Sequence, residues 1–413
     1  MISPLVALNR VLRLCAPLPS QRLSLDNALG LVLAEDVRSR IALPPFDNSS
    51  MDGYAVRARD CARATVRRPV RLRIRGAIHA GDRRSRTLRA GEAIPVATGA
   101  PVPRGADGVL PMERVSVEGR ELVVPTAVVR GACVRRRGEE VRPGDRVLPG
   151  GSVVHAGAVG CLAAVGRSHV RVVRMPRVTV ITTGDEVVQP GRALAHGSVY
   201  DSNFPMLGAL LRQAGITPGR IRHVRDDEPA LERALADALV KSDVVITVGG
   251  VSVGPRDFVR GVLARLGVRE EFWLVRQQPG KPLYFGRRGR RLVFGLPGNP
   301  ASAFVCFCFY VLPALRALGG HAAAAPVLEY RALSSAVVAD PHRWRLLRAR
   351  AVDGSPPLID VLPRQGSHMV TSRGYATHLV VLPPGAAGAK GKRVPAGTRV
   401  RCLCLAHAGD APS

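Results

Sequence analysis

Between residues 178 and 318, short apolar stretches alternate regularly with helical patterns, and this alternation constrains the fold more than any other feature. Strands are predicted at residues 178–182, 220–224, 244–248 and 292–295, and helices at residues 203–214, 229–241, 256–267 and from 300 onward. Strands and helices that follow one another at this spacing are typical of a parallel sheet covered by helices. The sequence therefore predicts a multidomain α/β protein whose central domain is a doubly wound, mainly parallel sheet.

The rest of the chain predicts smaller units around this sheet. Residues 3–14 and 22–36 have helical spacing, whereas the chain from about residue 42 to 173 and the tail from 324 to 413 contain short, mostly β-like segments interrupted by Gly and Pro. We expect four domains: residues 1–20 with 174–322 as the α/β domain, 21–45 with 136–173 as a linker domain, 46–135 as a β-rich inserted domain, and 323–413 as a C-terminal β-barrel-like domain.

The formal net charge is +28, which on its own would suit a polyanionic partner. Only four of the 60 basic residues are lysines, the arginines are spread along the chain, and aromatic residues make up only 4%. Sites for single-stranded nucleic acid combine a basic groove with aromatic side chains, and that combination is missing. We therefore attribute the charge to a general preference for arginine and expect no nucleic-acid partner.

The cysteine pattern and the apolar runs indicate where the protein is found. The eight cysteines include two C-x-C pairs on apolar elements, with no histidine at metal spacing, so we expect small buried thiols in a reducing compartment. Arg10 and Arg13 interrupt the first apolar stretch, which argues against a signal peptide. The apolar run 303–315 is shorter than the roughly 20 residues that cross a bilayer. The predicted location is cytoplasmic, without membrane association.

Polar and glycine-rich stretches follow three of the predicted strands. "TTGDE" follows the first strand, "GGVSVGPRD" the third and "GLPGNP" the last. Because ligands of an open α/β sheet lie beyond the carboxyl ends of its strands, we expect these stretches to share one site. Glycine N–H groups and a helix start suit a phosphate group, and the sequence has neither a Walker loop nor a G-x-G-x-x-G fingerprint. Taken singly, "PGNP" is also a common tight turn and "TGDE" a common helix cap.

Seven segments of the chain occur in one order: "PPFDNSSMDGYAV", "ATGAPVPRGADGV", "TTGDEV", "GSVYDSN", "VVITVGGVSVGPRDF", "QPGKP" and "GLPGNPASAF". In this order they resemble the MoeA/gephyrin E-domain family, the molybdopterin molybdenumtransferases, closely over residues 22–318 and loosely in the tail. The sheet region also resembles the Mog-type adenylyltransferases, which carry a different glycine loop and lack the β-modules. The resemblance implies an elongated molecule with a Mog-like sheet domain that binds molybdopterin and its phosphates.

The resemblance implies a role in molybdenum cofactor biosynthesis: molybdate is inserted into adenylated molybdopterin with release of AMP, assisted by a divalent cation such as Mg²⁺. Carboxylates suit Mg²⁺, glycine N–H groups and lysine suit phosphates, and arginine and serine suit molybdate. The expected catalytic residues are Asp52, Thr98, Glu186, Asp257 and Lys281, and the expected Mg²⁺ ligands are Asp185, Glu186 and Asp257. The expected substrate-binding residues are Gly249, Gly250, Ser252, Gly254, Pro297, Gly298, Asn299, Asp201 and Asn203, together with Arg348, Ser367 and Arg373 for molybdate.

Asp52 and Thr98 lie in the β-module, far in sequence from the sheet. By itself Asp52 is a turn-forming residue before an apolar strand. The resemblance implies that this module reaches the cleft of the partner subunit in a homodimer. It also implies transient contact with the Mog-type adenylyltransferase and with molybdoenzyme apoproteins.

Three positions depart from the family pattern: Gln278 stands where many relatives have lysine, Glu140 where many have aspartate, and His342 where glycine is usual. Two alternatives remain, a scaffold of the gephyrin type that clusters a partner and a Mog-type molybdopterin adenylyltransferase. The scaffold would not need the acids and Lys281, and it would combine this sequence with a Mog-type domain. The sequence therefore favours the molybdenum-inserting enzyme.

Overall fold

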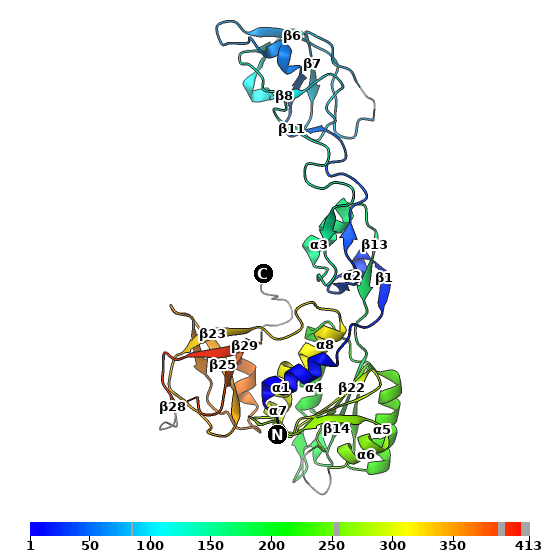
Figure 1. Cartoon of the computed structure of the whole chain (residues 1–413), viewed down its shortest axis with the longest axis vertical. Helices are drawn as coiled ribbons and strands as arrows, with labels where there is room; N and C mark the ends of the chain where they lie inside the picture. Colours follow the sequence, from blue (N-terminus) through cyan, green and yellow to red (C-terminus); the bar gives the residue numbers. More distant parts are fainter. Residues whose placement is uncertain (84–85, 252–256, 387–392, 406–413) are drawn as a thin grey trace.

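The computed structural model describes residues 1–83, 86–251, 257–386 and 393–405. The molecule is elongated (Figure 1): a β-rich body in blue and cyan lies at one end, a small body lies in the middle, and a large α/β body lies at the other end. The C-terminal segment, orange to red, forms a fourth body beside the α/β body. The predicted multidomain α/β architecture and its elongated shape are confirmed.

The α/β body is built on a six-stranded sheet. Its order is β17 (Arg220–Val224), β14 (Val178–Thr183), β18 (Val244–Val248), β22 (Arg291–Leu296), β21 (Tyr284–Arg288) and β19 (Arg269–Trp273). The first four strands are parallel, and β21 and β19 complete the sheet in antiparallel pairing. Every predicted strand is therefore present and the mainly parallel sheet is confirmed, while β19 and β21 were not predicted.

Alternate residues of the strands pack on opposite faces of this sheet, as the two-residue period of a strand requires. Val244 and Ile246 share a core with α1 (Pro4–Arg13), α4 (Asn203–Gln213) and α7 (Pro300–Cys306). Val245 instead joins the core of α5 (Glu228–Lys241) and α6 (Val259–Arg265). Helices therefore cover both faces (Figure 1), which explains why every residue of the central strand β18 is buried.

The chain from Pro300 to Leu318 forms one helical run in which α7 continues through a π-helical turn, η3 (Phe307–Val311), into α8 (Leu312–Leu318). By length and composition this run of 19 residues could cross a membrane, which the shorter apolar stretch in the sequence did not suggest. However, 78% of its apolar window is buried inside the structure. Its core also includes Leu346 and Leu403 of the C-terminal segment. A helix that packs on two bodies is apolar on all sides.

The C-terminal segment forms a small barrel. Its strands are β25 (Trp344–Val352), β26 (Leu358–Val361), β23 (Leu328–Leu333), β29 (Arg399–Cys404) and β27 (His378–Leu382), in that order, and the short strand β20 (Gln277–Gln278), which comes from the chain before β21, pairs beside β25. An additional pairing of β25 with β27 closes the ring. Two short strands, β24 (Val337–Val338) and β28 (Arg393–Val394), and the 3-10 turn η4 (Thr371–Tyr375) complete this body.

The β-rich end body contains a second six-stranded sheet. Its order is β8 (Gly108–Pro111), β5 (Gly53–Val56), β7 (Glu92–Val96), β6 (Val70–Ile74), β10 (Glu121–Val124) and β9 (Ser116–Glu118). The 3-10 turns η1 (Ala58–Cys61) and η2 (Met112–Arg114) lie beside it. The short strands β4 (Asn48–Ser49) and β11 (Val134–Arg135) pair where the chain enters and leaves this body.

The middle body corrects one expectation. Residues 22–36, predicted as a helix, form β1 (Ser20–Ser24), the single turn α2 (Leu25–Ala28) and β2 (Val32–Leu33). The reason is tertiary, because β1 pairs along its whole length with β13 (His169–Val173) and the turn ends at Gly30, whose φ is +79°. The body is completed by α3 (Ala156–Ala164) and by β3 (Val37–Arg38), which pairs with β12 (Arg146–Leu148).

No disulfide joins any of the eight cysteines, all of which lie among the described residues. The expectation of buried thiols is right for only part of the set. Buried positions are Cys61, Cys306, Cys308 and Cys402, whereas Cys161 and Cys404 are exposed.

Candidate functional site

Three parallel strands end in one row at the edge of the central sheet. Val248 at the end of β18 lies in register with Thr182 of β14 on one side and with Leu296 of β22 on the other. The N–H of Gly249 donates to the carbonyl oxygen of Leu296 at 3.1 Å, and a methyl group added to Gly298 would lie 3.6 Å from the Cα of Gly249. The glycine loops after β18 and β22 therefore run side by side.

The backbone requires glycine in the first of these loops. Gly249 and Gly250 have φ of +90° and +67°, which disfavours any other residue. A Cβ at Gly249 would also lie 2.8 Å from Oγ1 of Thr183, and one at Gly250 would lie 2.7 Å from Val259. The pair thus lets the chain turn tightly against the end of β14. The other two predicted residues of this loop, Ser252 and Gly254, lie outside the described residues.

Asp201 and Asn203 make hydrogen bonds that hold the local structure at the end of β14. The Asp201 carboxylate accepts hydrogen bonds from the N–H groups of Asn203 (3.0 Å) and Phe204 (2.8 Å), so it caps α4, and it accepts a third from Thr182 Oγ1 at 3.2 Å. Asn203 Nδ2 donates to the carbonyl oxygen of Gly298 at 2.7 Å. Both side chains are buried. They hold the turn 297–299, which we call the "PGN" turn, against the end of β14. The sequence alone predicts only substrate binding for both residues.

The acids expected to bind a metal lie on loops at this edge. Asp185 and Glu186 follow β14 and are exposed, and Asp257 precedes α6 and is half-buried. Asp185 Oδ1 accepts a hydrogen bond from the N–H of Asp226, at the end of β17, at 3.2 Å. Among the described residues, no group of three or more His, Cys, Asp or Glu side chains lies close enough to hold a metal ion. The three acids do not form a ready-made cage.

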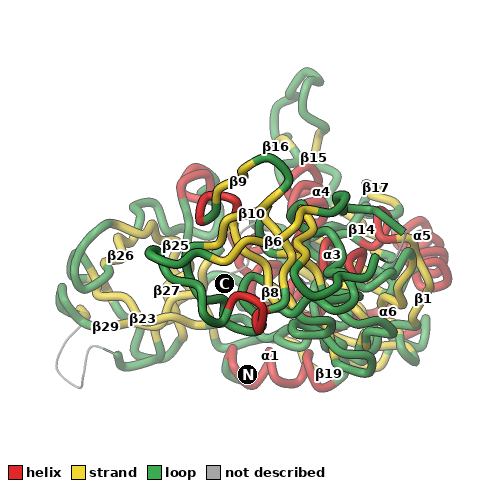
Figure 2. Tube along the Cα trace, turned by 90° about the horizontal axis from the view of Figure 1, so that it is seen from above, coloured by secondary structure: helices red, strands yellow, loops and turns green. Residues whose placement is uncertain are grey.

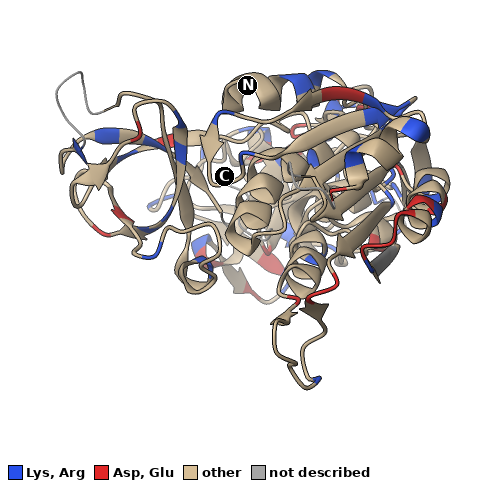
Figure 3. Cartoon of the chain, turned by 90° about the horizontal axis from the view of Figure 1, so that it is seen from below, with Lys and Arg blue, Asp and Glu red and all other residues tan. Residues whose placement is uncertain are grey.

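After Glu186 the chain leaves the body as a long projecting loop, which Figure 2 shows beyond β15 (Val187–Val188) and β16 (Val199–Tyr200). Its exposed apolar side chains include Leu194, Val199 and Tyr200. The loop begins and ends beside site residues, since Asp201 follows β16 directly. Figure 3 shows basic residues on many elements of this face rather than in one stripe.

Lys281 reaches the same edge from the opposite direction. Because β21 is antiparallel to β22 and its first residue, Tyr284, lies opposite Gly295, the turn before β21 lies near the end of β22. Gln277, which is fully buried, holds this turn. Its amide Nε2 donates to the carbonyl oxygen of Gly280 at 3.2 Å, and its Oε1 accepts from the buried Tyr310 hydroxyl.

Sequence reasoning missed Gln277 and Tyr310. A tyrosine within an apolar helix and a glutamine just before a "PGK" turn were the available signals. Gly280 confirms how tightly they pack, because a Cβ there would lie 2.7 Å from the Gln277 amide and 2.5 Å from Cys306 Sγ. The amide therefore determines where the Lys281 backbone starts.

The C-terminal barrel contributes a segment that touches the "PGN" turn. Asn299 Nδ2 donates to Ser367 Oγ at 3.2 Å, and the N–H of Ala301 donates to the Ser367 carbonyl oxygen at 3.1 Å. The N–H groups at the start of α7, which suit a phosphate group, are therefore not all free for a ligand. At least one is occupied by the tail, so an anion at this helix start would share it with Ser367.

Arg348, expected to bind molybdate, is fully buried in β25. Its Nε donates to Ser372 Oγ at 2.8 Å, and its Nη2 donates to the carbonyl oxygens of Arg364 (2.8 Å) and Gly366 (3.3 Å). Nη1 is buried without a hydrogen-bond partner in the described structure. Burial, and secondly the charge of Arg373, lower the pKa of Arg348 to about 10. Its main contacts hold the segment that carries Ser367.

Arg373 lies between the tail and the α/β body. Its Nη1 donates to the Pro300 carbonyl oxygen at 3.3 Å and contacts the Met206 sulfur. Burial lowers its pKa below the usual range. Ser367 and Arg373 therefore belong to one segment beside the "PGN" turn, and Arg348 of β25 is hydrogen-bonded to that segment.

Asp52 and Thr98 lie together, but far from the other predicted residues. Asp52 Oδ1 accepts a hydrogen bond from the N–H of Thr98 at 2.7 Å, and both residues are exposed. Asp52 directly precedes β5 and Thr98 follows β7, and both strands belong to the end body, which lies at the opposite end of the long axis from β14 (Figure 1). Within one chain these two residues do not join the strand-end site.

The three positions that depart from the family pattern are exposed. The N–H of His342 donates to Asp340 Oδ1 at 2.9 Å, a contact that any residue with an N–H can make. Glu140 and Gln278 likewise lie at the surface. None of the three substitutions disturbs the packing.

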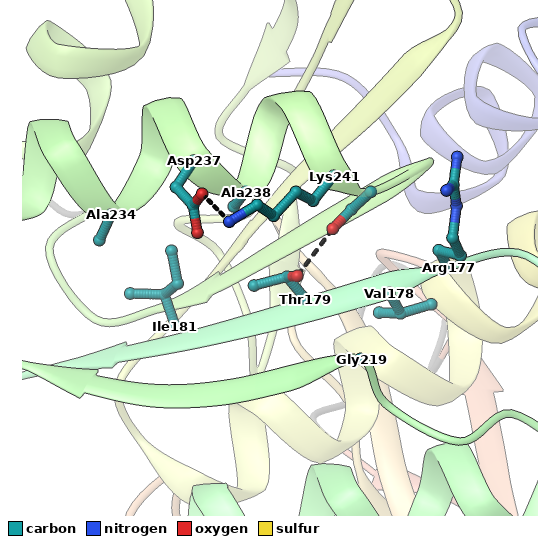
Figure 4. Close-up of a pocket in the computed structure, with 10 residues that line it drawn as sticks. Arg177, Val178, Thr179, Ile181, Gly219, Ala234, Asp237, Ala238 and Lys241 are labelled. Carbon is teal, nitrogen blue, oxygen red and sulfur yellow. Dashed lines mark hydrogen bonds and ion pairs between the residues drawn. The ribbon is translucent and has the colours of Figure 1, made fainter.

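One cavity lies at the opposite edge of the sheet, where the parallel strands begin. A cavity of about 130 Å³ is lined by residues at the starts of strands, including Val178, Thr179 and Gly219 (Figure 4). Thr179 bonds Ser242 at 2.7 Å there, and Lys241 pairs with Asp237. Ligands of such sheets bind at the carboxyl ends of the strands, so this cavity is not part of the site.

Comparison with known proteins agrees with this geometry. Residues 2–166 match the model of the MoeA N-terminal region (domain I and II), and residues 179–317 match that of a probable molybdopterin binding domain. The chain is 34% identical over 379 residues to molybdopterin molybdenumtransferase 2 of Mycobacterium tuberculosis, covering 90% of this chain and 92% of that protein. It is 31% identical over 392 residues to the molybdopterin molybdenumtransferase of Staphylococcus epidermidis, covering 94% and 93%.

A solved structure extends the match to the whole fold. The molybdopterin biosynthesis MoeA protein of Pyrococcus horikosii superposes with a TM-score of 0.84 at 31% identity, covering 98% of this chain and 99% of that one. Fold and site thus define a multidomain transferase built on a molybdopterin-binding type of sheet domain. The chain belongs to the molybdopterin molybdenumtransferase (MoeA) family, and its role lies in molybdenum cofactor biosynthesis.

Proposed function

We propose that this chain inserts molybdate into adenylated molybdopterin, with release of AMP, and so forms the molybdenum cofactor. One observation supports this most directly: the glycine loops at Gly249 and Gly298 lie side by side, and the tail segment at Ser367 lies against the second of them. Backbone N–H groups of such loops bind phosphates, and the tail adds serine and arginine donors for an oxyanion. A scaffold or an adenylyltransferase would not need both.

The molybdate subsite is proposed at the tail segment. The buried Nη1 of Arg348 has no hydrogen-bond partner among the described residues, and leaving such a group unpaired costs free energy that an anion would recover. Arg373 is half-buried nearby, and Ser367 offers a hydroxyl whose oxygen already accepts from Asn299. We assign Arg348 mainly to positioning and Ser367 and Arg373 to contact with the oxyanion.

The carboxylates at the strand ends would supply only part of the ligands of a Mg²⁺ ion. Magnesium keeps several waters and binds one or two carboxylates together with substrate phosphates, so it needs no cluster of three protein ligands. Asp185 and Glu186, with Asp257 across the loop, offer suitable hard oxygens at the edge where we place the phosphates. When bound, the ion would neutralise phosphate charge, and Lys281 would add a second cation.

The proposed enzyme is a cytoplasmic homodimer. Asp52 and Thr98 are exposed in the β-rich end body, far from the strand-end site of the same chain. They would therefore complete a cleft only in a partner subunit. We further propose brief contacts with the adenylyltransferase that supplies the substrate and with apoproteins that accept the product. The bounds of the four domains remain part of this proposal.

The test measures AMP released from adenylated molybdopterin in the presence of molybdate and Mg²⁺. Asp257→Ala should abolish release without changing the unfolding midpoint, because the acid is expected to serve the ligand. The matched control is Asp353→Ala, an exposed acid in the loop after β25, which should leave release unchanged. A stability loss of roughly 2–5 kcal/mol in Asp257→Ala, typical of a core deletion, would show a structural role instead.

A further inference from the structure

A second cleft, of about 290 Å³, lies in the middle body, away from the sheet edge. Four arginines line it, and two acids share the lining: Arg22, Arg40, Arg167, Arg171, Glu35 and Asp36. None of the four arginines forms an ion pair with a carboxylate in the described part of the chain. The cleft shares no residue with the site of the proposed enzyme.

Two of these arginines face each other across a pair of strands. Arg22 of β1 lies directly opposite Arg171 of β13 in the antiparallel register. Like charges in this arrangement repel each other and destabilise the pair. Both side chains are exposed, because the next pair along the two strands, Leu23 and Val170, points to the core. The arrangement becomes favourable when an anion lies between the two guanidinium groups.

Arg167 gives an independent sign of a missing partner. Its Nη2 donates to the Arg38 carbonyl oxygen at 2.8 Å, which anchors the guanidinium beside the turn that follows β3. Its Nε is buried and has no hydrogen-bond partner in the described structure. Buried donors are paired in nearly all native structures. An acceptor in the cleft would satisfy this one.

The two acids do not neutralise the cleft. Asp36 accepts a hydrogen bond from the N–H of Gly150 at 2.9 Å and lies 3.6 Å from Arg146 and 3.9 Å from Arg38, neither of which lines the cleft. The charge of Asp36 is therefore balanced by residues that lie outside the cleft. Glu35 remains as the one acid against four guanidinium groups.

The lining also indicates the class of ligand. It contains no Phe, Tyr or Trp side chain for a base or a pterin ring, its one imidazole, His169, lies 3.1 Å from Ser168 Oγ through Nδ1, and its only apolar residues are Val37 and Val170. The volume is at the lower limit of small-molecule sites, roughly 300 Å³. Four guanidinium groups offer more donors than one phosphate accepts in bidentate contacts. We propose that this cleft binds a compact polyanion of the diphosphate class, a site that goes beyond the proposed function.

The test is calorimetric titration of the full chain with inorganic pyrophosphate at low ionic strength, without divalent cations. A Lys281→Gln background reduces binding at the strand-end loops. We expect saturable binding in this background, weakened about tenfold by Arg22→Gln or by Arg171→Gln, since each removes a charge-assisted contact. The matched control is Arg73→Gln, an exposed arginine of β6, which should bind as the background does.

Three results would overturn the proposal. Pyrophosphate binding that disappears in the Lys281→Gln background would place the ligand at the strand ends. Equal weakening by Arg73→Gln would show a general effect of net charge. Complete loss of binding when sodium chloride matches the ionic strength of the titrant would show unspecific screening. Exposed Arg→Gln changes leave the core intact, and equal unfolding midpoints verify this.

Discussion

Gln277 determines how well Lys281 is placed, although it is buried and cannot touch a ligand. We predict that Gln277→Leu weakens binding of adenylated molybdopterin about tenfold, because the Gly280 carbonyl oxygen and the Tyr310 hydroxyl lose their shared partner. Leaving buried polar groups unpaired should also lower the free energy of unfolding by roughly 1–3 kcal/mol. Ligand affinity and urea unfolding measure the two effects.

The neighbouring residue offers a matched control. Gln278 is exposed, so Gln278→Leu should change stability by less than about 0.5 kcal/mol. If Gln277→Leu lowers stability but binds the ligand as tightly as the unmodified protein, the amide supports the core and does not position Lys281.

At the scale of elements, the start of α4 depends on a residue outside the helix. Ser202, at the cap position, makes no capping bond, and Asp201 takes this role. We predict that Asp201→Ala lowers the free energy of unfolding by about 1–2 kcal/mol, whereas Asp201→Asn, which can still cap, loses much less. Equal stability of both variants with equal loss of activity would instead assign Asp201 to the ligand.

The elements also show what the sequence could predict. β14, β18 and α5 were predictable because their apolar pattern is local and their packing agrees with it. Residues 22–36 were not, because pairing with β13, far along the chain, overrides helical spacing. The glycine loops could be located because they directly follow predicted strands. The burial of Arg348 was unpredictable, since its partners include backbone carbonyls that leave no signature in the sequence.

At the scale of the whole molecule, Asp243 fixes the segment that connects β13 of the middle body to β14 of the sheet. It accepts two hydrogen bonds from Arg174 (2.7 and 2.8 Å), just after β13, and one from the N–H of Arg177 (2.8 Å). Burial alone would raise the pKa of Asp243, but these bonds outweigh it and lower the pKa. The stabilisation is therefore complete above the unfolded-state pKa near 3.9 and is lost as pH falls through the lower folded-state pKa.

We predict that Asp243→Asn lowers the urea midpoint at neutral pH and flattens its decline below about pH 4, where the unmodified protein loses this contribution. Urea unfolding between about pH 3 and 7 measures this. Asp353→Asn, at an exposed carboxylate, serves as the control and should follow the unmodified curve. Parallel curves for Asp243→Asn and the unmodified protein would show that the ion pair adds no pH-dependent stability.

The largest-scale prediction concerns the homodimer. Asp52 and Thr98 flank β5 and β7, whose body lies at one end of the long axis, and Asp257 and Lys281 precede α6 and β21, whose body lies at the other end (Figure 1). If a cleft combines residues of two subunits, Asp52→Ala and Asp257→Ala should each be inactive alone but active after subunit exchange. A mixed dimer then has one cleft with both defects and one with neither, so at most about half the activity per dimer should return.

Two measurements make this complementation decisive. Native mass spectrometry of differently tagged subunits shows that mixed dimers form, and AMP release reports the activity. A chain carrying both substitutions, mixed with either single variant, is the control, because it leaves no intact cleft in any dimer. If mixed dimers form and no activity returns, Asp52 does not serve the partner's cleft. Its bond to the Thr98 N–H would then be the ordinary contact of a turn before β5.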